Sequence, residues 1–230
     1  MRTLYVVPVL AIAAGVLSAA PATGALGGVE VTRSTARFDS VTGKLAAVEV
    51  ALTNTSGKTV TAWSYDVEGT YADGSVTRST ATVDDISALL APETRSRALA
   101  PGTSRTSGGT TLPLGKAGDL PTKVEATLTM VVFDDDLAAG DAQSIGRFGG
   151  LRRHIAAIMS ALLDQVQEAI GAPDPRGALK ALIEKYPGQG MYLQLLPMYD
   201  HGPAALEMVL SADRAYRDLM LQHSELKPVN

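Results

Sequence analysis

The stretch Leu45–Ala81 decides the fold, and it reads LAAVEVALTNTSGKTVTAWSYDVEGTYADGSVTRSTA. Near its start, Val48, Val50 and Leu52 alternate with polar or small residues. This spacing is typical of a strand with one buried face. The polar segment Asn54–Lys58, which contains a glycine, then predicts a turn.

A second alternation follows this turn, with Trp63, Tyr65 and Val67 as its apolar members. It ends at Asp73-Gly74, a pair that favours the positive φ angles of a two-residue hairpin loop. Val76–Ala81 is therefore expected to run back antiparallel. Three consecutive strands joined by such short turns predict a β-sheet core, and we expect Trp63 to lie inside it.

The composition is that of a folded protein. The chain has 230 residues, of which 46% are hydrophobic and 19% charged, enough for one large or two small domains with real cores. The formal net charge is −4, so nucleic acid or an anionic membrane is not expected as a partner. There is no cysteine, which excludes disulfides, cysteine nucleophiles, thiolate metal sites and a lipidated cysteine.

The first residues have the order of a secretory signal peptide. Arg2 supplies a positive charge, Leu4–Leu17 is apolar and uncharged, and Ser18–Ala22 consists of small residues and proline. The apolar run is shorter than the roughly 20 residues of a membrane-spanning helix. We expect residues 1–22 to be a signal peptide that is removed after Ala22, leaving a bacterial periplasmic or secreted protein without a membrane span. The alternative is an uncleaved anchor.

Further strands are predicted on both sides of the central stretch. Val29, Val31 and Phe38 indicate a first strand, and the clean alternation of Val124–Val132 indicates the last one, with both faces covered near its end. Between these strands, Ile86–Leu90 favours a helical turn or a sheet crossover. Residues 103–111 are rich in Ser, Thr and Gly, which favours an edge strand or a loop.

The segment Val29–Phe133 resembles the immunoglobulin-like and fibronectin-type-III-like β-sandwich modules of exported bacterial proteins. In such modules a strand like Val-Glu-Val-Ala-Leu-Thr-Asn-Thr-Ser leads through a polar turn to the next, and Trp63 falls on the third strand, where they often keep a core tryptophan. The cross-sheet cysteine pair of antibody domains is absent. The resemblance implies an antiparallel sandwich of about seven strands over residues 28–140. Together with a helical region over residues 141–230, which the spacing of its apolar residues predicts, this gives an α+β protein.

Asp134-Asp135-Asp136 follows the last predicted strand, and Asp141 comes five residues later. Four carboxylates so close suit Ca²⁺, which takes about six to eight oxygen ligands. The spacing, however, lacks the alternate acids, the central glycine and the terminal glutamate of an EF-hand loop. A solvated turn followed by Asp141 as a helix N-cap is therefore favoured.

The rest of the chain has the spacing of amphipathic helices, with apolar residues at steps of three and four. We expect about three helices: a long one that ends at Gly171, one from Pro175 to Tyr186, and one that begins near Pro203. Two starts are possible for the long helix. It begins near Asp141, or it breaks at Gly149-Gly150. In the second case Arg152 and Arg153 would face the positive end of the new helix dipole and would need acidic partners such as Asp134–Asp136. Because the helices carry more apolar side chains than so small a unit buries by itself, the long helix is expected to dock against the sheet.

The most apolar stretch of the mature chain lies between the second and third predicted helices. A buried connector in the helical core is the favoured interpretation. The alternative is an adaptable surface for another envelope or extracellular protein, since Met and Tyr suit irregular apolar contacts. The residues of this possible partner surface are Met191, Tyr192, Leu195, Met198 and Tyr199.

No catalytic or cofactor motif is recognisable. His154, His201 and His223 have no metal-ligand partners at helical spacing and are expected at the surface or at helix caps. The nucleophile elbow, the phosphate loop and the dinucleotide motif are missing. The basic group Arg147, Arg152 and Arg153 is a possible anion contact, although nearby aspartates are expected to neutralise it. We expect no catalytic residue, no metal and no cofactor.

These features predict an exported binding or envelope-interaction protein that is not an enzyme. One alternative is a structural subunit of an envelope assembly, which would expose the Met191–Tyr199 stretch as an apolar patch. The other is a hydrolase based on dispersed carboxylates, which would need Asp134, Asp135 or Glu184 to converge in one pocket.

Overall fold

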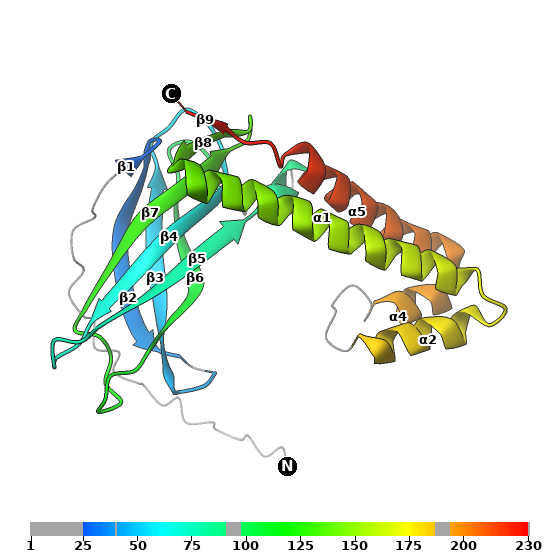
Figure 1. Ribbon diagram of the computed structural model, residues 1–230, viewed down its shortest axis with the longest axis horizontal. Helices are drawn as coiled ribbons and strands as arrows, with labels where there is room; N and C mark the ends of the chain where they lie inside the picture. Colours follow the sequence, from blue (N-terminus) through cyan, green and yellow to red (C-terminus); the bar gives the residue numbers. More distant parts are fainter. Residues whose placement is uncertain (1–24, 40, 91–97, 187–193, 230) are drawn as a thin grey trace, which may run out of the picture.

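The computed structural model describes residues 25–39, 41–90, 98–186 and 194–229. The expected signal peptide therefore lies outside the described residues. The chain is an α+β protein in which all strands but the last precede the α-helices, and the α-helices project from one end of the β-domain (Figure 1). Among the described residues, none of the helices has the length and apolarity that crossing a bilayer requires.

The first sheet is built around the strand that opens the deciding stretch. β3 (Leu45–Asn54) buries every second residue from Ala46 onwards, because its side chains alternate between the core and the outer face. It pairs antiparallel with β2 (Val29–Phe38) and with β6 (Ser104–Pro113), and β1 (Ala25–Leu26) pairs with β2. β6 is an edge of this sheet, as expected for the segment rich in Ser, Thr and Gly.

In the second sheet, β4 (Val60–Thr70) lies between β5 (Val76–Asp84) on one side and β7 (Lys123–Phe133) on the other. β8 (Leu137–Gly140) follows and pairs with β7, so the prediction that β7 is the last strand is wrong. β9 (Lys227–Pro228), from the end of the chain, adds a parallel pair to β8. Both strands are too short to show an alternation in the sequence.

The two sheets face each other, and the main core lies between them. Trp63 is 1% exposed and belongs to this core together with Tyr65 and Val67, as the alternation predicts. The turn Asn54–Lys58 joins strands that do not pair, because β3 lies in the first sheet and β4 in the second. The buried Asn54 side chain holds this crossing, since its amide donates to the carbonyl oxygens of Lys58 and Leu99 at 2.8 Å each.

β4 and β5 form the predicted antiparallel hairpin, but its loop is longer than Asp73-Gly74 suggested. The five residues Tyr71–Ser75 separate the strands, and the Tyr71 N–H donates to the Ser75 carbonyl at 2.9 Å. Only Gly74, with φ of 80°, lies in the left-handed region. The two-residue loop typical of an Asp-Gly pair needs positive φ at both positions, so it does not form here.

The long helix α1 (Ala142–Ile170) runs for 29 residues without a break at Gly149-Gly150. It begins after Asp141, whose carboxylate accepts from the Ser144 N–H at 2.9 Å as an N-cap. Gly149 is buried, and a methyl group on it would overlap the carbonyl oxygen of Ser224. A glycine is therefore needed at position 149 because α1 packs closely against Ser224, which follows the last helix.

Gly149→Ala is expected to lower the free energy of unfolding by about 1–3 kcal/mol, because overpacking outweighs the gain in helix propensity. Gly146, in the same helix, is the matched control, since no atom lies near the place of its methyl group. Gly146→Ala is expected to raise the free energy of unfolding by about 0.5–1 kcal/mol. Urea unfolding followed by circular dichroism measures both. Stabilisation by both changes would show that Ser224 does not approach Gly149 in solution.

The remaining helices form an arm with α1. A short 3₁₀ helix, η1 (Ile86–Leu89), follows β5 and packs against the end of this arm that lies on the β-domain. α5 (Pro203–Gln222) runs beside α1, while α2 (Pro175–Lys185) and α4 (Leu195–Asp200) lie at the far end (Figure 1). The arm has a core of its own, to which Leu163, Leu179, Leu195 and Leu210 contribute. The spacing of apolar residues did not predict α4, which has only six residues.

α1 also joins the arm to the β-domain. Ile145 and Phe148 pack on Ala62, Met130 and Val132, which lie on the outer face of the second sheet. This contact confirms the expectation that the long helix docks against the sheet. It also explains why both faces of β7 are buried near its end.

A fragment that spans Gly28–Ala142 is expected to be less soluble than the chain from Gly28 to its end. Without α1, the apolar side chains of Ala62, Met130 and Val132 would face water. Sedimentation at matched concentrations measures solubility, and a thermal melt measures stability. If the fragment matches the longer chain in both, the helices are an independent module.

Candidate functional site

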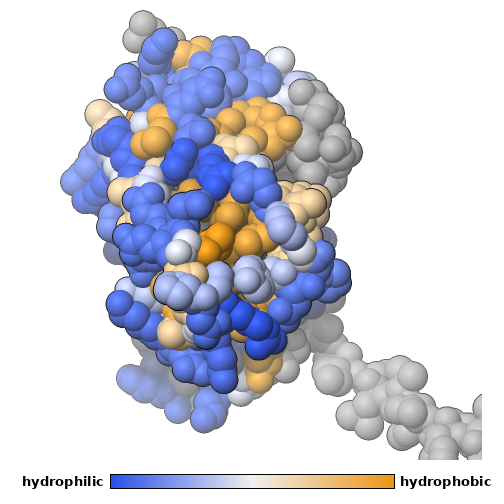
Figure 2. All heavy atoms as spheres, turned by 90° about the vertical axis from the view of Figure 1, so that its right-hand side faces the viewer, coloured by the Kyte–Doolittle hydropathy of each residue, from blue (hydrophilic) through white to orange (hydrophobic). Residues whose placement is uncertain are grey.

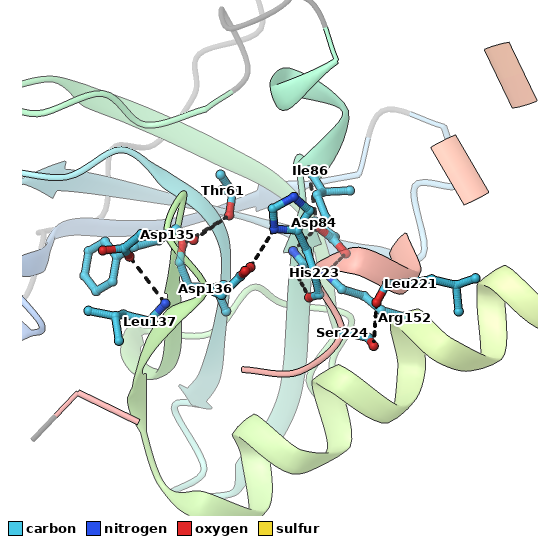
Figure 3. A network of polar contacts seen from close by, with 12 residues as sticks. Thr61, Asp84, Ile86, Asp135, Asp136, Leu137, Arg152, Leu221, His223 and Ser224 are labelled. Atoms are coloured by element: carbon cyan, nitrogen blue, oxygen red, sulfur yellow. Dashed lines mark hydrogen bonds and ion pairs between the residues drawn. The ribbon is translucent and has the colours of Figure 1, made fainter. Parts of the chain in front are cut away.

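A buried ion pair ties the arm to the β-domain (Figure 3). Arg152, on α1, is 1% exposed, and its Nε and Nη2 donate to the carboxylate of Asp84, at the end of β5, at 3.0 and 2.8 Å. Its Nη1 donates to the carbonyl oxygen of His223 at 2.7 Å, and its guanidinium lies 4.7 Å from the centroid of the Phe148 ring. The acidic partner of Arg152 is therefore Asp84 and not the cluster Asp134–Asp136.

The chain that follows α5 closes the same region. His223 Nδ1 lies 2.6 Å from Asp136 Oδ1, and the Lys227 N–H donates to the Asp136 carbonyl at 2.9 Å. Burial, together with the nearby Asp84 carboxylate, raises the pKa of the Tyr216 phenol on α5. We call Asp84, Asp136, Arg152 and His223 the junction. It connects α1, α5, β5 and the turn before β8, so its contacts hold elements together.

The aspartates of the acidic turn have separate partners. Asp135 pairs with Lys58 at 2.5 Å, and this hydrogen bond holds the pKa of Asp135 below its usual value. Asp136 pairs with His223, and Asp141 caps α1. Within the described ranges, no group of three or more His, Asp or Glu residues is placed to hold a metal ion. The turn-and-cap interpretation accounts for Asp135, Asp136 and Asp141.

Arg147, Arg152 and Arg153 do not form one anion site. Arg152 is buried against Asp84, and Arg153 Nη1 donates to the Ser224 carbonyl at 3.3 Å. Arg147 is exposed and points elsewhere, since residues five apart on a helix do not share a face.

The possible partner surface is only partly within the described residues. Leu195 is fully buried in the core of the arm, and Met198 and Tyr199 are half-buried against it. These three residues fit the buried-connector interpretation, and Leu195 is not available to a partner. Met191 and Tyr192 lie outside the described residues. Figure 2, which views the helical end of the molecule, shows apolar groups surrounded by hydrophilic ones.

The other candidate titratable residues lie apart. His201 Nδ1 is 2.6 Å from the Pro197 carbonyl at the end of α4, and His154 is exposed on α1. Glu184, beside Lys180 on α2, lies at the far end of the arm, whereas Asp134 and Asp135 lie before β8 (Figure 1). The three carboxylates named for a hydrolase therefore do not converge.

A recess lies where α1 leaves the outer face of the second sheet, next to the junction. Its volume is about 390 Å³. Asp66 Oδ1 accepts from the Thr80 hydroxyl at 2.6 Å, and the hydroxyls of Ser64 and Thr82 lie 3.0 Å apart. The floor is thus an ordered set of outward side chains, namely Ser64 and Asp66 of β4, Thr80 and Thr82 of β5, and Thr129 of β7.

The first turns of α1 form the wall of this recess. Ser144 and Arg147 contribute polar groups beside Asp141, while Phe148 and Leu151 contribute apolar surface. The Ser144 hydroxyl donates to Asp141 Oδ2 at 2.6 Å. No ion pair or hydrogen bond joins Arg147 to the part of the chain that the structure describes. Its guanidinium donors are therefore free to meet a ligand.

Two carboxylates, Asp66 and Asp141, line this recess, which raises the question of hydrolysis. Hydrogen bonds from the hydroxyl and the amide of Ser144 lower the pKa of Asp141. Asp141 therefore stays ionised near neutral pH, whereas a glycosidase needs one carboxylic acid with a raised pKa as proton donor. No histidine lines the recess. Asp141 therefore does not have the raised pKa that such a proton donor needs.

No family model matches the sequence, and no curated protein matches it. A solved structure of a hypothetical protein from Peptoclostridium difficile 630 is similar with a TM-score of 0.35 and 12% sequence identity. The match covers 50% of this chain and 87% of the other. A similarity this low supports no statement about fold family or function.

Proposed function

We propose that this protein is an exported, non-catalytic binding protein that holds a polar ligand in the recess between the second sheet and α1. The observation that carries the proposal is the convergence of an ordered hydroxyl floor with a wall that contains an unpaired arginine. Such hydroxyls both donate and accept hydrogen bonds, so they suit a ligand that does the same. The apolar side chains of Phe148 and Leu151 beside them give the mixed lining that is common in ligand sites.

The charge of the recess restricts the ligand. Asp66 and Asp141 outnumber Arg147, so an anion would be repelled on balance. A neutral or cationic molecule fits, with Arg147 donating to its hydroxyl or carbonyl oxygens. Another envelope or extracellular molecule that displays such a group is the expected partner.

Amide NMR shifts of the ¹⁵N-labelled protein test this function. D-glucose, N-acetyl-D-glucosamine and inorganic phosphate are the probes. At least one neutral sugar is expected to shift the amides of Thr80, Thr82 and Ser144 saturably, whereas phosphate leaves them unchanged. If neither these sugars nor any other neutral or cationic polar probe shifts these amides saturably, the proposal is contradicted.

Two tryptophan substitutions complete the test. Thr82→Trp fills the recess and is expected to abolish the saturable shifts. Thr106→Trp, on the edge strand β6 of the other sheet, is the matched control, since Thr82 and Thr106 are both exposed strand residues. Unchanged sugar binding by Thr82→Trp would place the site elsewhere.

We further propose that the β-domain is an immunoglobulin-like or fibronectin-type-III-like sandwich. The two facing sheets and the buried Trp63 support this assignment.

Export carries a prediction of its own. The order of charge, apolar run and small residues in 1–22 supports a cleaved signal peptide. The intact mass of the protein recovered from the periplasm or medium is expected to place its first residue within a few positions of Ala22. A full-length chain in the envelope would indicate an anchor.

A further inference from the structure

A second depression continues the recess along the same face of the second sheet. Its volume is about 430 Å³, and it shares Asp66 with the recess. Glu68, Arg78, Glu125 and Thr127 also line it. Because Asp66 and Glu68 are two residues apart on β4, their side chains point to the same face, and the two hollows form one polar groove.

We propose that the ligand is a neutral oligosaccharide laid along β4, from the recess under α1 to this second depression. The inference rests on the proposed function and names the class and length of its ligand. From Ser64 to Glu68 the strand rises roughly 13 Å, at about 3.3 Å per residue. The groove is thus longer than a single sugar ring, and a monosaccharide would leave one hollow empty.

The pairing of the strands provides polar contacts along the whole groove. Thr80 and Thr127 flank Asp66 in register, and Arg78 and Glu125 flank Glu68. Every row therefore offers both donors and acceptors, as a chain of hydroxylated rings requires. At the end of the groove next to α1, Leu151 is 43% exposed. It offers an apolar surface to the C–H face of the sugar ring that occupies the recess.

The charges argue against an acidic glycan. Four carboxylates line the two hollows, from Asp66, Glu68, Glu125 and Asp141, against the guanidinium groups of Arg78 and Arg147. Arg78 is already paired with Glu68 at 2.7 Å. A chain with repeated carboxylate or sulfate groups would meet net repulsion.

The strand pairing also argues against an extended peptide. β4 pairs with β5 on one side and with β7 on the other, so its backbone groups are not available to a peptide laid on the face. A peptide that adds to a sheet uses an exposed edge instead. Side chains alone must recognise the ligand of this groove, which suits a saccharide.

Calorimetric titration of the protein with three probes tests the proposal: tetra-N-acetylchitotetraose as a neutral chain, N-acetyl-D-glucosamine as its single unit, and a hyaluronan tetrasaccharide as an acidic chain. The neutral tetrasaccharide is expected to bind at least about tenfold more tightly than the monosaccharide, since the second hollow adds hydrogen bonds that the monosaccharide cannot reach. The acidic chain is expected to bind more weakly than the neutral one.

Variants locate the two ends of the ligand. Thr127→Trp fills the second depression and is expected to reduce the tetrasaccharide affinity to that of the monosaccharide, while monosaccharide binding stays unchanged. Thr82→Trp is expected to abolish both. Thr106→Trp, an exposed strand position on the other sheet, is expected to change neither, and a thermal melt verifies that each variant is folded.

The outcomes separate this inference from the proposed function. Equal affinity for monosaccharide and tetrasaccharide, or tighter binding of the acidic chain, would overturn the inference that the ligand is a neutral oligosaccharide. The recess would still be a binding site. Saturable binding in the recess of a neutral non-sugar, while all three saccharides fail, would also overturn only the inference. If neither sugars nor other neutral probes bind in the recess, the proposed function fails as well.

Discussion

Arg152→Met is expected to lower the free energy of unfolding by about 3–5 kcal/mol. The substitution leaves the Asp84 carboxylate, whose side chain is 16% exposed, without its cationic partner. It also removes the Arg152 Nη1 group that donates to the carbonyl oxygen of His223, the residue at the C-terminal end of α5. Methionine retains much of the apolar stem beside Phe148, so the loss reports the polar contacts. Urea unfolding followed by circular dichroism measures it.

Two controls isolate the ion pair. Arg37→Met removes an arginine that is paired with Glu49 at 2.7 Å but largely exposed, and it is expected to cost less than about 1 kcal/mol. Asp84→Asn combined with Arg152→Met removes both charges and is expected to cost less than the sum of the single changes. If Arg152→Met lowers the free energy of unfolding no more than Arg37→Met does, water solvates the junction in solution. The junction then does not hold the arm to the β-domain.

Trp63→Ala is expected to lower the free energy of unfolding by about 3–5 kcal/mol, measured in the same way. The ring is 1% exposed between the two sheets, and its removal leaves a cavity. The change also removes a cation–π contact, since the Arg105 guanidinium lies 5.5 Å from the centroid of the ring. Arg105 lies on the edge strand β6 and pairs with Asp85, which precedes η1, so the substitution is expected to weaken this contact as well.

Phe38→Ala is the matched control, because it also removes an aromatic side chain from a strand of the β-domain. Phe38 is 53% exposed, so its loss is expected to cost less than about 1 kcal/mol. Trp63→Phe retains most of the apolar volume and is expected to cost less than Trp63→Ala. The indole N–H has no hydrogen-bond partner among the described residues, so no such bond is lost. A near-native stability for Trp63→Ala would place the ring at the surface in solution.

The local patterns predicted most of the strands and the main helices. Alternation located β3, β4 and β7, because a strand buried on one face must place apolar side chains at every second position. The turn at Asp73-Gly74 indicated that β5 runs back antiparallel to β4. Asp141 marked the start of α1, where its carboxylate accepts the N–H of Ser144. These features depend on residues close in the chain, so the sequence shows them directly.

Contacts between distant residues decided what the local patterns left open or missed. Gly149-Gly150 left a helix break open as an alternative, but the helix begins after Asp141 and continues, and Gly149 allows the close approach of Ser224. The acidic partner of Arg152 is Asp84, which lies on β5, far from Arg152 in the sequence. β8 and β9 escaped notice because each is short and is held by pairing across the chain.

Residue type and short spacing suffice to predict the alternation of β3 and β4, the buried position of Trp63, the amphipathic helices and the absence of cysteine chemistry. The candidate site, in contrast, arises only when the chain is folded. Ser64, Asp66, Thr80 and Thr82 are the polar members of alternating strands, and nothing in their spacing distinguishes them from an ordinary solvent face. They line a recess because α1 crosses that face, held by Arg152 and Asp84. The geometry of that crossing depends on packing between elements far apart in the chain, which no local pattern encodes.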